Sequence, residues 1–227
     1  MKRHIPNALT CANLLSGCIG VVFAFKGDLG TAAYAVLFSG IFDFFDGFAA
    51  RWLNVKSPIG KELDSLADMV SFGFLPGVVM FQLLSQSDFS SPYVPYIGFI
   101  ITVFSALRLA KFNIDTRQTE DFIGLNTPMN TLFIVSLPFI QRDYPALINS
   151  TLVLVSLTMV MSFLLVSEIK IFSLKFGTTD WMQNKIKFIF LILSAVLIAL
   201  LKFAAIPIVL ILYISLSIVH FKRLDKL

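Results

Sequence analysis

Long apolar stretches dominate this chain and constrain its fold more than any other feature. Eight hydrophobic segments stand out, and most approach the roughly 20 residues that an α-helix needs to cross the hydrocarbon core of a bilayer. The segments are roughly 7–25, 30–50, 61–84, 93–112, 127–141, 146–167, 184–201 and 204–221. Charged residues make up 14% of the chain, well below the roughly 25% of soluble domains. The pattern predicts an all-α integral membrane protein with about eight transmembrane helices.

The distribution of Lys and Arg predicts how these helices are oriented. With a cytoplasmic N-terminus and eight spans, every Lys and Arg except Lys26, Arg142 and Lys202 falls on the cytoplasmic side. Cytoplasmic loops of membrane proteins carry such an excess of positive charge. We therefore expect both termini in the cytoplasm. We attribute the basic pI near 9.1 to contact with anionic membrane lipids, and we expect no nucleic-acid partner.

Four aspartates occur where two of the hydrophobic segments approach the cytoplasmic surface. Asp43 and Asp46 lie near the end of the second segment, and Asp64 and Asp68 lie one to two turns into the third. Residues three or four apart share a helix face, so each pair lines one face of its helix. Because the two segments run in opposite directions, we expect Asp43 to oppose Asp68 and Asp46 to oppose Asp64. The four would form a carboxylate box.

This carboxylate box points to a bound metal ion. Ionised carboxylates at membrane depth are costly without a compensating charge, and beyond Lys61 at the very start of the third segment, no basic residue lies inside the two segments to pair with them. Carboxylates without a nearby His or Cys favour a hard divalent cation, so we expect Mg²⁺, Mn²⁺ or Ca²⁺. The box has room for one or two ions, and two would suit displacement at the phosphorus of a pyrophosphate. A cation pathway and a structural role are the alternatives.

Small residues accompany the aspartates. Gly47 follows Asp46 directly, Ala50 lies one turn further, and Gly60 stands near the start of the third segment. Their small side chains leave room for a bulky ligand beside the helices. Arg51 ends the second segment at the membrane interface, where a planar guanidinium binds phosphate oxygens well. These residues predict pyrophosphate binding beside the metal.

The string D-x2-D-G-x2-A-R-x8-G-x3-D-x3-D, from Asp43 to Asp68, resembles the signature of the CDP-alcohol phosphatidyltransferase family at every fixed position. Residues 5–13 are similar to the family's P-N-x-x-T entrance to the first span, with Asn7 and Thr10 in place. The resemblance implies that a cytidine nucleotide lies beside this entrance. It also implies that Asp68, the last aspartate of the motif, serves as the general base.

Two further segments resemble the phosphatidylserine synthase branch of that family. Residues 106–113, ALRLAKFN, are similar to its R-L-A-[RK]-F-N segment, and residues 122–128, FIGLNTP, resemble its F-x-G-L-P-[ST]-P loop with Asn126 in place of a proline. The resemblance implies transfer of the phosphatidyl group of CDP-diacylglycerol to the hydroxyl of L-serine, with release of CMP. Arg108 and Asn113 are the candidate serine contacts. A homodimer in the cell membrane, with its active site facing the cytoplasm, is also implied.

The resemblance extends from residue 5 to about residue 175. We therefore expect a catalytic core of six spans over residues 1–175, and two additional helices of the same domain over residues 176–227. Glycerol 3-phosphate or an inositol phosphate is an alternative acceptor. However, few basic residues lie near the aspartates, which favours a small unphosphorylated alcohol. A divalent-cation transporter is the alternative from another functional class.

Overall fold

The computed structural model describes residues 4–55, 57–89, 91–117, 121–174 and 181–224. Some of the basic residues that underlie the predicted orientation lie outside the described residues: Lys2, Arg3, Lys56, Lys175 and Lys226. The side chain of Arg223 is likewise outside the description.

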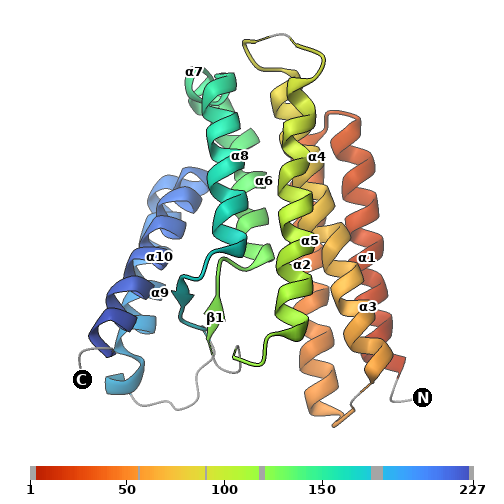
Figure 1. The fold of residues 1–227 in the computed structure, drawn as a ribbon, viewed down its shortest axis with the longest axis vertical. Coiled ribbons are helices and arrows are strands. Elements are labelled where there is room, and N and C mark those ends of the chain that lie inside the picture. Colours follow the sequence, from red (N-terminus) through yellow and green to blue (C-terminus); the bar gives the residue numbers. More distant parts are fainter. Residues whose placement is uncertain (1–3, 56, 90, 118–120, 175–180, 225–227) are drawn as a thin grey trace.

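The described chain is almost wholly helical (Figure 1). The elements are α1 (His4–Phe25), α2 (Leu29–Trp52), α3 (Pro58–Asp68), η1 (Met69–Phe74), α4 (Leu75–Ser85), η2 (Val94–Phe99), α5 (Ile100–Ile114), β1 (Phe122–Ile123), α6 (Thr127–Asp143), α7 (Pro145–Ile148), α8 (Thr151–Val166), β2 (Lys170–Ile171), α9 (Trp181–Leu201), η3 (Lys202–Ala204) and α10 (Ala205–Leu224). Each of the eight predicted hydrophobic segments contains a helix. The only departure from an all-α chain among the described residues is the short pair β1 and β2.

Five helical stretches in the described part of the chain are long and apolar enough to cross a membrane. They are His4–Phe25, Leu29–Trp52, Pro58–Ser85, Val94–Ile114 and Asn184–Lys222. The last of these comprises most of α9, all of η3 and most of α10. These stretches fit an integral membrane protein.

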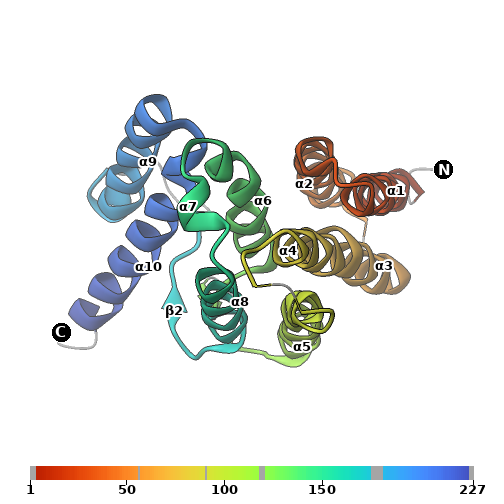
Figure 2. The same cartoon turned by 90° about the horizontal axis from the view of Figure 1, so that it is seen from above.

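One long helix, formed by α3, η1 and α4, runs through the middle of the bundle. Seen from above, α1 and α2 lie on one side of it and α5 lies on the opposite side, while α6 packs between α2 and α8 (Figure 2). The hairpin of α9 and α10 packs at the outer edge beside α6. A side chain at Gly17 of α1 would collide with Ser71 of η1, so glycine is needed where these two helices touch. Such small-residue contacts are typical of helices packed in membranes.

The segment η1 is a π-helical interruption of this long helix, and it begins directly after Asp68. Its cause lies in Pro76, which has no N–H to donate to the carbonyl of Phe72 four residues earlier. Thr131 of α6 donates its hydroxyl to that Phe72 carbonyl at 2.8 Å. Thr102 of α5 donates to the neighbouring Gly73 carbonyl at 3.1 Å. Helices on one side of the bundle thus satisfy the backbone groups that the interruption exposes.

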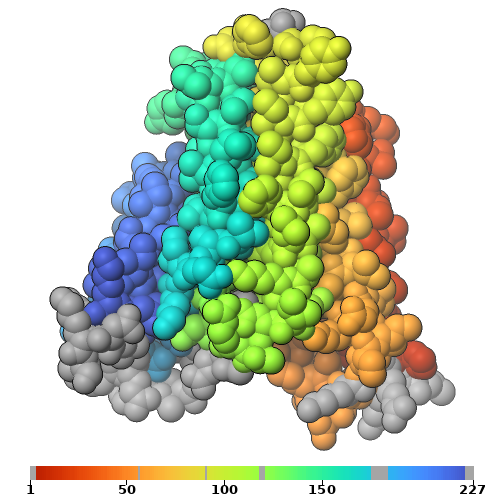
Figure 3. Space-filling view, viewed as in Figure 1, coloured from red at the N-terminus to blue at the C-terminus, as the bar shows by residue number. Residues whose placement is uncertain are grey.

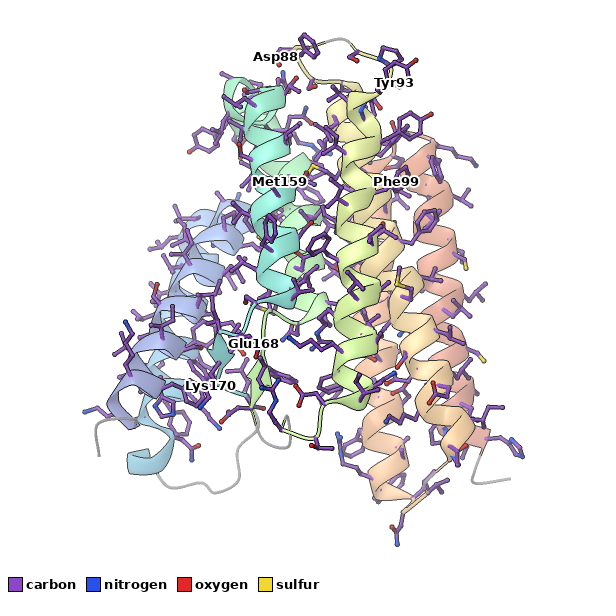
Figure 4. The ribbon with its side chains drawn as sticks, in the orientation of Figure 1. Asp88, Tyr93, Phe99, Met159, Glu168 and Lys170 are labelled. Atoms are coloured by element: carbon purple, nitrogen blue, oxygen red, sulfur yellow. The ribbon has the colours of Figure 1, made fainter. Side chains whose placement is uncertain are left out.

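The two ends of the bundle are closed by different contacts (Figure 4). At one end Asp88, which lies near Tyr93, accepts hydrogen bonds from the backbone N–H and the hydroxyl of Thr151. These bonds hold the pKa of Asp88 below its ordinary value. At the other end Glu168 pairs with Lys111, and this hydrogen bond lowers the pKa of Glu168. Hydrogen bonds to acidic side chains therefore join separate segments at both ends of the bundle, and at one end the partner is a cationic Lys.

The loop around Asn126 explains a departure from the pattern of the resembling branch. Asn126 precedes α6, and its Oδ1 accepts the backbone N–H of Met129 at 2.9 Å. Asparagine is among the preferred residues at such an N-cap. Nearby, β1 pairs antiparallel with β2, and the hydroxyl of Tyr213 donates to the Phe172 carbonyl at 2.6 Å. These bonds attach α10 to the end of the bundle where α6 begins.

Replacing Thr131 by the isosteric valine should destabilise the protein, because the Phe72 carbonyl left free by Pro76 would lose its partner. We expect a loss of about 1–2 kcal/mol, measured as a lower midpoint of thermal unfolding in detergent. The matched control is Thr158→Val, since the buried Thr158 hydroxyl bonds only to Leu154 of its own helix. Equal midpoints for the two variants would contradict this role of Thr131.

Candidate active site

Three aspartates converge where α2 meets α3. Asp43 comes from α2, and Asp64 and Asp68 lie one turn apart on α3. One carboxylate oxygen from each lies within 4.8 Å of the other two. The four-residue spacing on α3 points both of its aspartates to the same side. The structure therefore brings together three of the four predicted carboxylates.

Asp46, the fourth aspartate, lies slightly apart from the other three. It lies outside the group of three, and its Oδ2 accepts the hydroxyl of Thr10 of α1 at 2.7 Å. Three residues along an α-helix correspond to a rotation of about 300°, so Asp46 is on the same side of α2 as Asp43 but is offset toward α1. Asp46 still lines the same cavity as Asp64. Asp43 lies close to both Asp64 and Asp68, and this includes the expected approach of Asp43 to Asp68.

The group of three carboxylates fits a divalent metal ion. Among the described residues, no Lys or Arg forms an ion pair with Asp43, Asp64 or Asp68. Oδ1 of Asp64 is buried and has no hydrogen-bond partner in the described part of the chain. All the donor atoms are carboxylate oxygens, the ligands that Mg²⁺ and Mn²⁺ prefer. A buried acceptor without a partner, within a cluster of negative charge, is what a cation would complete.

The sequence interpretation did not single out Asn13, which contacts this group directly. Asn13 is fully buried on α1, and its Nδ2 donates to Oδ1 of Asp68 at 3.3 Å. The backbone carbonyl of Asn13 accepts hydrogen bonds from the hydroxyls of Ser39 and Ser71, both at 3.1 Å. Asn13 thereby links α1, α2 and the long central helix beside Asp68. The available signal was a small or polar residue at every third or fourth position of an apolar helix, beginning with Pro6 and Thr10.

A cavity of about 510 Å³ opens beside the aspartates, between α1, α2 and the start of α3. Its lining consists of Pro6, Asn7, Thr10, Asp46, Gly47, Ala50, Val55, Ser57, Pro58, Gly60, Lys61 and Asp64. The predicted nucleotide residues Asn7, Thr10, Gly47, Ala50 and Gly60 are all in this lining. Among residues not predicted, Lys61 adds a positive charge and Ser57 caps α3 by accepting the N–H of Gly60.

Two contacts explain the small residues of the cavity. A Cβ at Gly60 would lie 2.9 Å from Oδ1 of Asn7, so a side chain there would push Asn7 into the cavity. A Cβ at Gly47 would lie 3.7 Å from a guanidinium nitrogen of Arg51. Arg51 is exposed and is not part of the lining, but its guanidinium lies beside the cavity wall at Gly47.

The predicted acceptor residues Arg108 and Asn113 take different positions. Arg108 is 7% exposed, its guanidinium stacks on Phe112 at 4.8 Å, and Asp68 attracts it electrostatically. Asn113 instead donates its Nδ2 to the Ser65 hydroxyl at 2.8 Å, which ties α5 to α3. Arg108 therefore lies toward the aspartates, whereas the amide nitrogen of Asn113 already has a partner within the protein.

Replacing Asp64 by asparagine should weaken the binding of Mn²⁺ at least tenfold, because it removes one negative ligand from the group of three. The fraction of free Mn²⁺ can be followed by its electron paramagnetic resonance signal with purified protein in detergent. Asp28→Asn is the control, since Asp28 is exposed and caps only α2, where it accepts from Thr31. Unchanged Mn²⁺ affinity of the Asp64 variant would contradict a metal site at these carboxylates.

Comparison with known proteins agrees with the residues of this site. The family profile of CDP-alcohol phosphatidyltransferase matches residues 3–164. The chain is 33% identical to a CDP-diacylglycerol–serine O-phosphatidyltransferase of Bacillus subtilis over 173 residues, which cover 74% of this chain and 89% of the relative. A protein of the same name from Methanocaldococcus jannaschii is 32% identical over 73% of this chain and 72% of its own length. An archaetidylserine synthase of Methanothermobacter thermautotrophicus is 27% identical over 69% of this chain and 66% of its own length. Together with the aspartate motif, these matches show that the chain belongs to the CDP-alcohol phosphatidyltransferase family.

Proposed function

We propose that this protein transfers the phosphatidyl group of CDP-diacylglycerol to the hydroxyl of L-serine, producing phosphatidylserine and CMP. The observation that carries the proposal is the convergence of Asp43, Asp64 and Asp68 between an open cavity and the buried Arg108. Relatives named as serine O-phosphatidyltransferases support serine as the acceptor.

The cavity suits the nucleotide and the pyrophosphate of the donor. Its volume of about 510 Å³ is within the usual range for small-molecule sites. Lys61 lies in its wall and Arg51 lies beside it, so cationic groups are available to phosphate oxygens. Asn7 and Thr10 in the same lining offer polar groups to the cytidine. The pyrophosphate then reaches the carboxylates at Asp46 and Asp64.

Asp68 is the proposed general base. The amide of Asn13 donates to its Oδ1, which orients the carboxylate. In the reaction the serine oxygen bonds to the phosphorus that bears diacylglycerol, the bond from that phosphorus to the CMP oxygen breaks, and Asp68 receives the serine proton. A divalent ion bound at the carboxylates, Mg²⁺ or Mn²⁺ with Ca²⁺ as an alternative, supplies positive charge that offsets the charge on the leaving CMP.

The diacylglycerol tails require an apolar path from the same site. A second hollow of about 300 Å³ between α2 and α6 supports this requirement. Its lining is almost wholly apolar and consists of Val36, Leu37, Gly40, Ile41, Phe44, Phe45, Phe72, Pro128 and Leu132. Phe44 directly follows Asp43 along α2, so acyl chains in this hollow would begin beside the carboxylates and continue toward the lipid.

The membrane arrangement completes the proposal. We expect eight spans with both termini and the aspartates on the cytoplasmic side of the cell membrane, because Lys and Arg concentrate on that side. Residues 1–175 form the catalytic core and residues 176–227 add two helices. The family match over residues 3–164 supports this division, and every proposed site residue lies inside it. A homodimer is expected from the family resemblance.

Release of CMP tests this function. Purified protein in detergent with CDP-diacylglycerol and Mn²⁺ should release CMP when serine is added, and Asp68→Asn should lower that rate at least a hundredfold while leaving expression and the unfolding midpoint unchanged. Glycerol 3-phosphate and an inositol phosphate are supplied in parallel reactions. CMP release with glycerol 3-phosphate or the inositol phosphate but not with serine would overturn the choice of serine. No CMP release with any of the three acceptors would favour the alternative of a divalent-cation transporter.

Gly60→Ala should raise the KM for CDP-diacylglycerol about five- to tenfold, because the added methyl displaces Asn7 into the cavity. The KM for serine should stay within a factor of two. Gly30→Ala is the matched control, since a Cβ at Gly30 makes only ordinary contacts of 3.7 and 3.8 Å far from the aspartates along α2. An unchanged donor KM in the Gly60 variant would show that the cavity does not hold the nucleotide.

A further inference from the structure

Several buried polar side chains on α5 and α6 lack partners in the described part of the chain. Asn130 of α6 is fully buried, and neither its Oδ1 nor its Nδ2 has a hydrogen bond among the described residues. The hydroxyls of Thr127 and Ser105 are also buried without a partner there. Buried polar groups are nearly always hydrogen-bonded, and each exception requires an explanation. Asn130 is the strongest exception of this group, because both its amide oxygen and its amide nitrogen lack a hydrogen-bond partner among the described residues.

The contacts of α5 place its polar residues beside Asp68. Asn113 bonds to Ser65 near one end of α5, and Thr102 bonds to the Gly73 carbonyl nearer the other end. The helix therefore runs antiparallel to the central helix in a constant register, which brings Arg108 level with Asp68. Ser105 lies about one turn from Arg108 along α5, beside Gly73. A Cβ added at Gly73 would lie 3.1 Å from the Cβ of Ser105.

The contacts of α6 place Asn130 at nearly the same level. Thr131 bonds to the Phe72 carbonyl, and α6 runs in the same direction as the central helix (Figure 1). Thr127 is therefore level with Asp68, and Asn130 lies about one turn above it. Both α5 and α6 contact η1. Seen from above, α5 lies on the side of the central helix away from α1 and α2, and α6 lies between α2 and α8 (Figure 2). On the outer face, atoms of α5 and α8 meet and cover this region (Figure 3).

We propose that Asn130, together with Arg108 and Ser105, binds the ammonium and carboxylate groups of the amino-acid acceptor. The inference rests on the proposed function, and it assigns a binding role to a residue that the family motifs do not contain. Arg108 suits the carboxylate, because its guanidinium is buried and forms no hydrogen bond or ion pair within the described residues. The Asn130 amide suits a zwitterion, because its oxygen accepts from an ammonium group while its nitrogen donates to a carboxylate.

The direction of the reaction supports this position. In phosphoryl-type transfer the attacking and leaving oxygens lie roughly in line on opposite sides of phosphorus. The cavity proposed for the nucleotide lies on the side of α1 and α2, so the acceptor must approach the carboxylates from the opposite side. Arg108 lies on that side, on α5, and Asn130 lies on α6, which also contacts η1. Asn113, the other candidate serine contact from the sequence, donates its Nδ2 to Ser65.

The test is the variant Asn130→Leu, which keeps a similar volume and removes both polar atoms. In the CMP-release assay we expect the KM for serine to rise roughly tenfold or more, as for a lost hydrogen bond to a charged group, with the KM for CDP-diacylglycerol within a factor of two. Discrimination between serine and ethanolamine, which lacks the carboxylate, should fall. The unfolding midpoint without serine should stay equal or rise, because a partnerless buried amide has been removed.

One control and one alternative variant distinguish a binding role of Asn130 from a general loss of structure. Ser194→Ala removes another buried hydroxyl without a described partner, in α9 and outside the site, and should leave both KM values unchanged. Asn130→Ala serves if the leucine variant does not fold, with the same expected rise in the serine KM. An unchanged serine KM, or an equal rise in both KM values, would overturn the role of Asn130. Failure of the wild-type protein to release CMP with serine would instead overturn the proposed function, and this is measured before any variant.

Discussion

Compensation of charge inside an apolar helical bundle is the constraint on which this structure depends. Carboxylates removed from water are costly unless hydrogen bonds or a cation offset them. Asp46 accepts a hydrogen bond from the Thr10 hydroxyl, and Asp68 accepts one from the Asn13 amide. Among the described residues, no Lys or Arg forms an ion pair with Asp43 or Asp64. The bundle thus provides partial compensation and leaves the remainder for a metal ion.

Backbone groups follow the same rule. Pro76 removes one donor from the central helix, and the π-helical turn that results lies directly after Asp68. Such turns often occur at functional sites because they alter the direction of side chains on one helix. Here Thr131 and Thr102 satisfy the Phe72 and Gly73 carbonyls from two neighbouring helices. The irregular turn is therefore held by α5 and α6, which also carry the proposed acceptor residues.

The central helix separates two environments. On the side of α1 and α2, a cavity with Lys61 in its wall is open to a nucleotide. On the side of α5 and α6, Arg108 and Asn130 are buried. A reaction in which the leaving group and the attacking group occupy opposite sides of phosphorus fits this division. The aspartates lie between the two environments, where both substrates would meet.

The sequence by itself determined the helical membrane fold and the identity of the aspartate motif. Apolar length predicts helices because a bilayer leaves no backbone group unpaired, and the fixed spacing from Asp43 to Asp68 carries the family resemblance. It also predicted most of the cavity lining, including Gly60 beside Asn7, because small residues at set spacings follow directly from the motif.

Only the tertiary structure decided how the site is assembled. Helical spacing alone does not reveal that Asp46 accepts a hydrogen bond from Thr10 of α1. Asn13 and Asn130 carry no local pattern that distinguishes them from packing residues, and their importance follows from what other helices bring beside them. Likewise, Asn113 resembles a ligand in sequence, yet its amide donates to Ser65. Hydrogen-bond partners between helices depend on their rotation and register, which arise from packing across the whole bundle, and short sequence patterns do not contain that information.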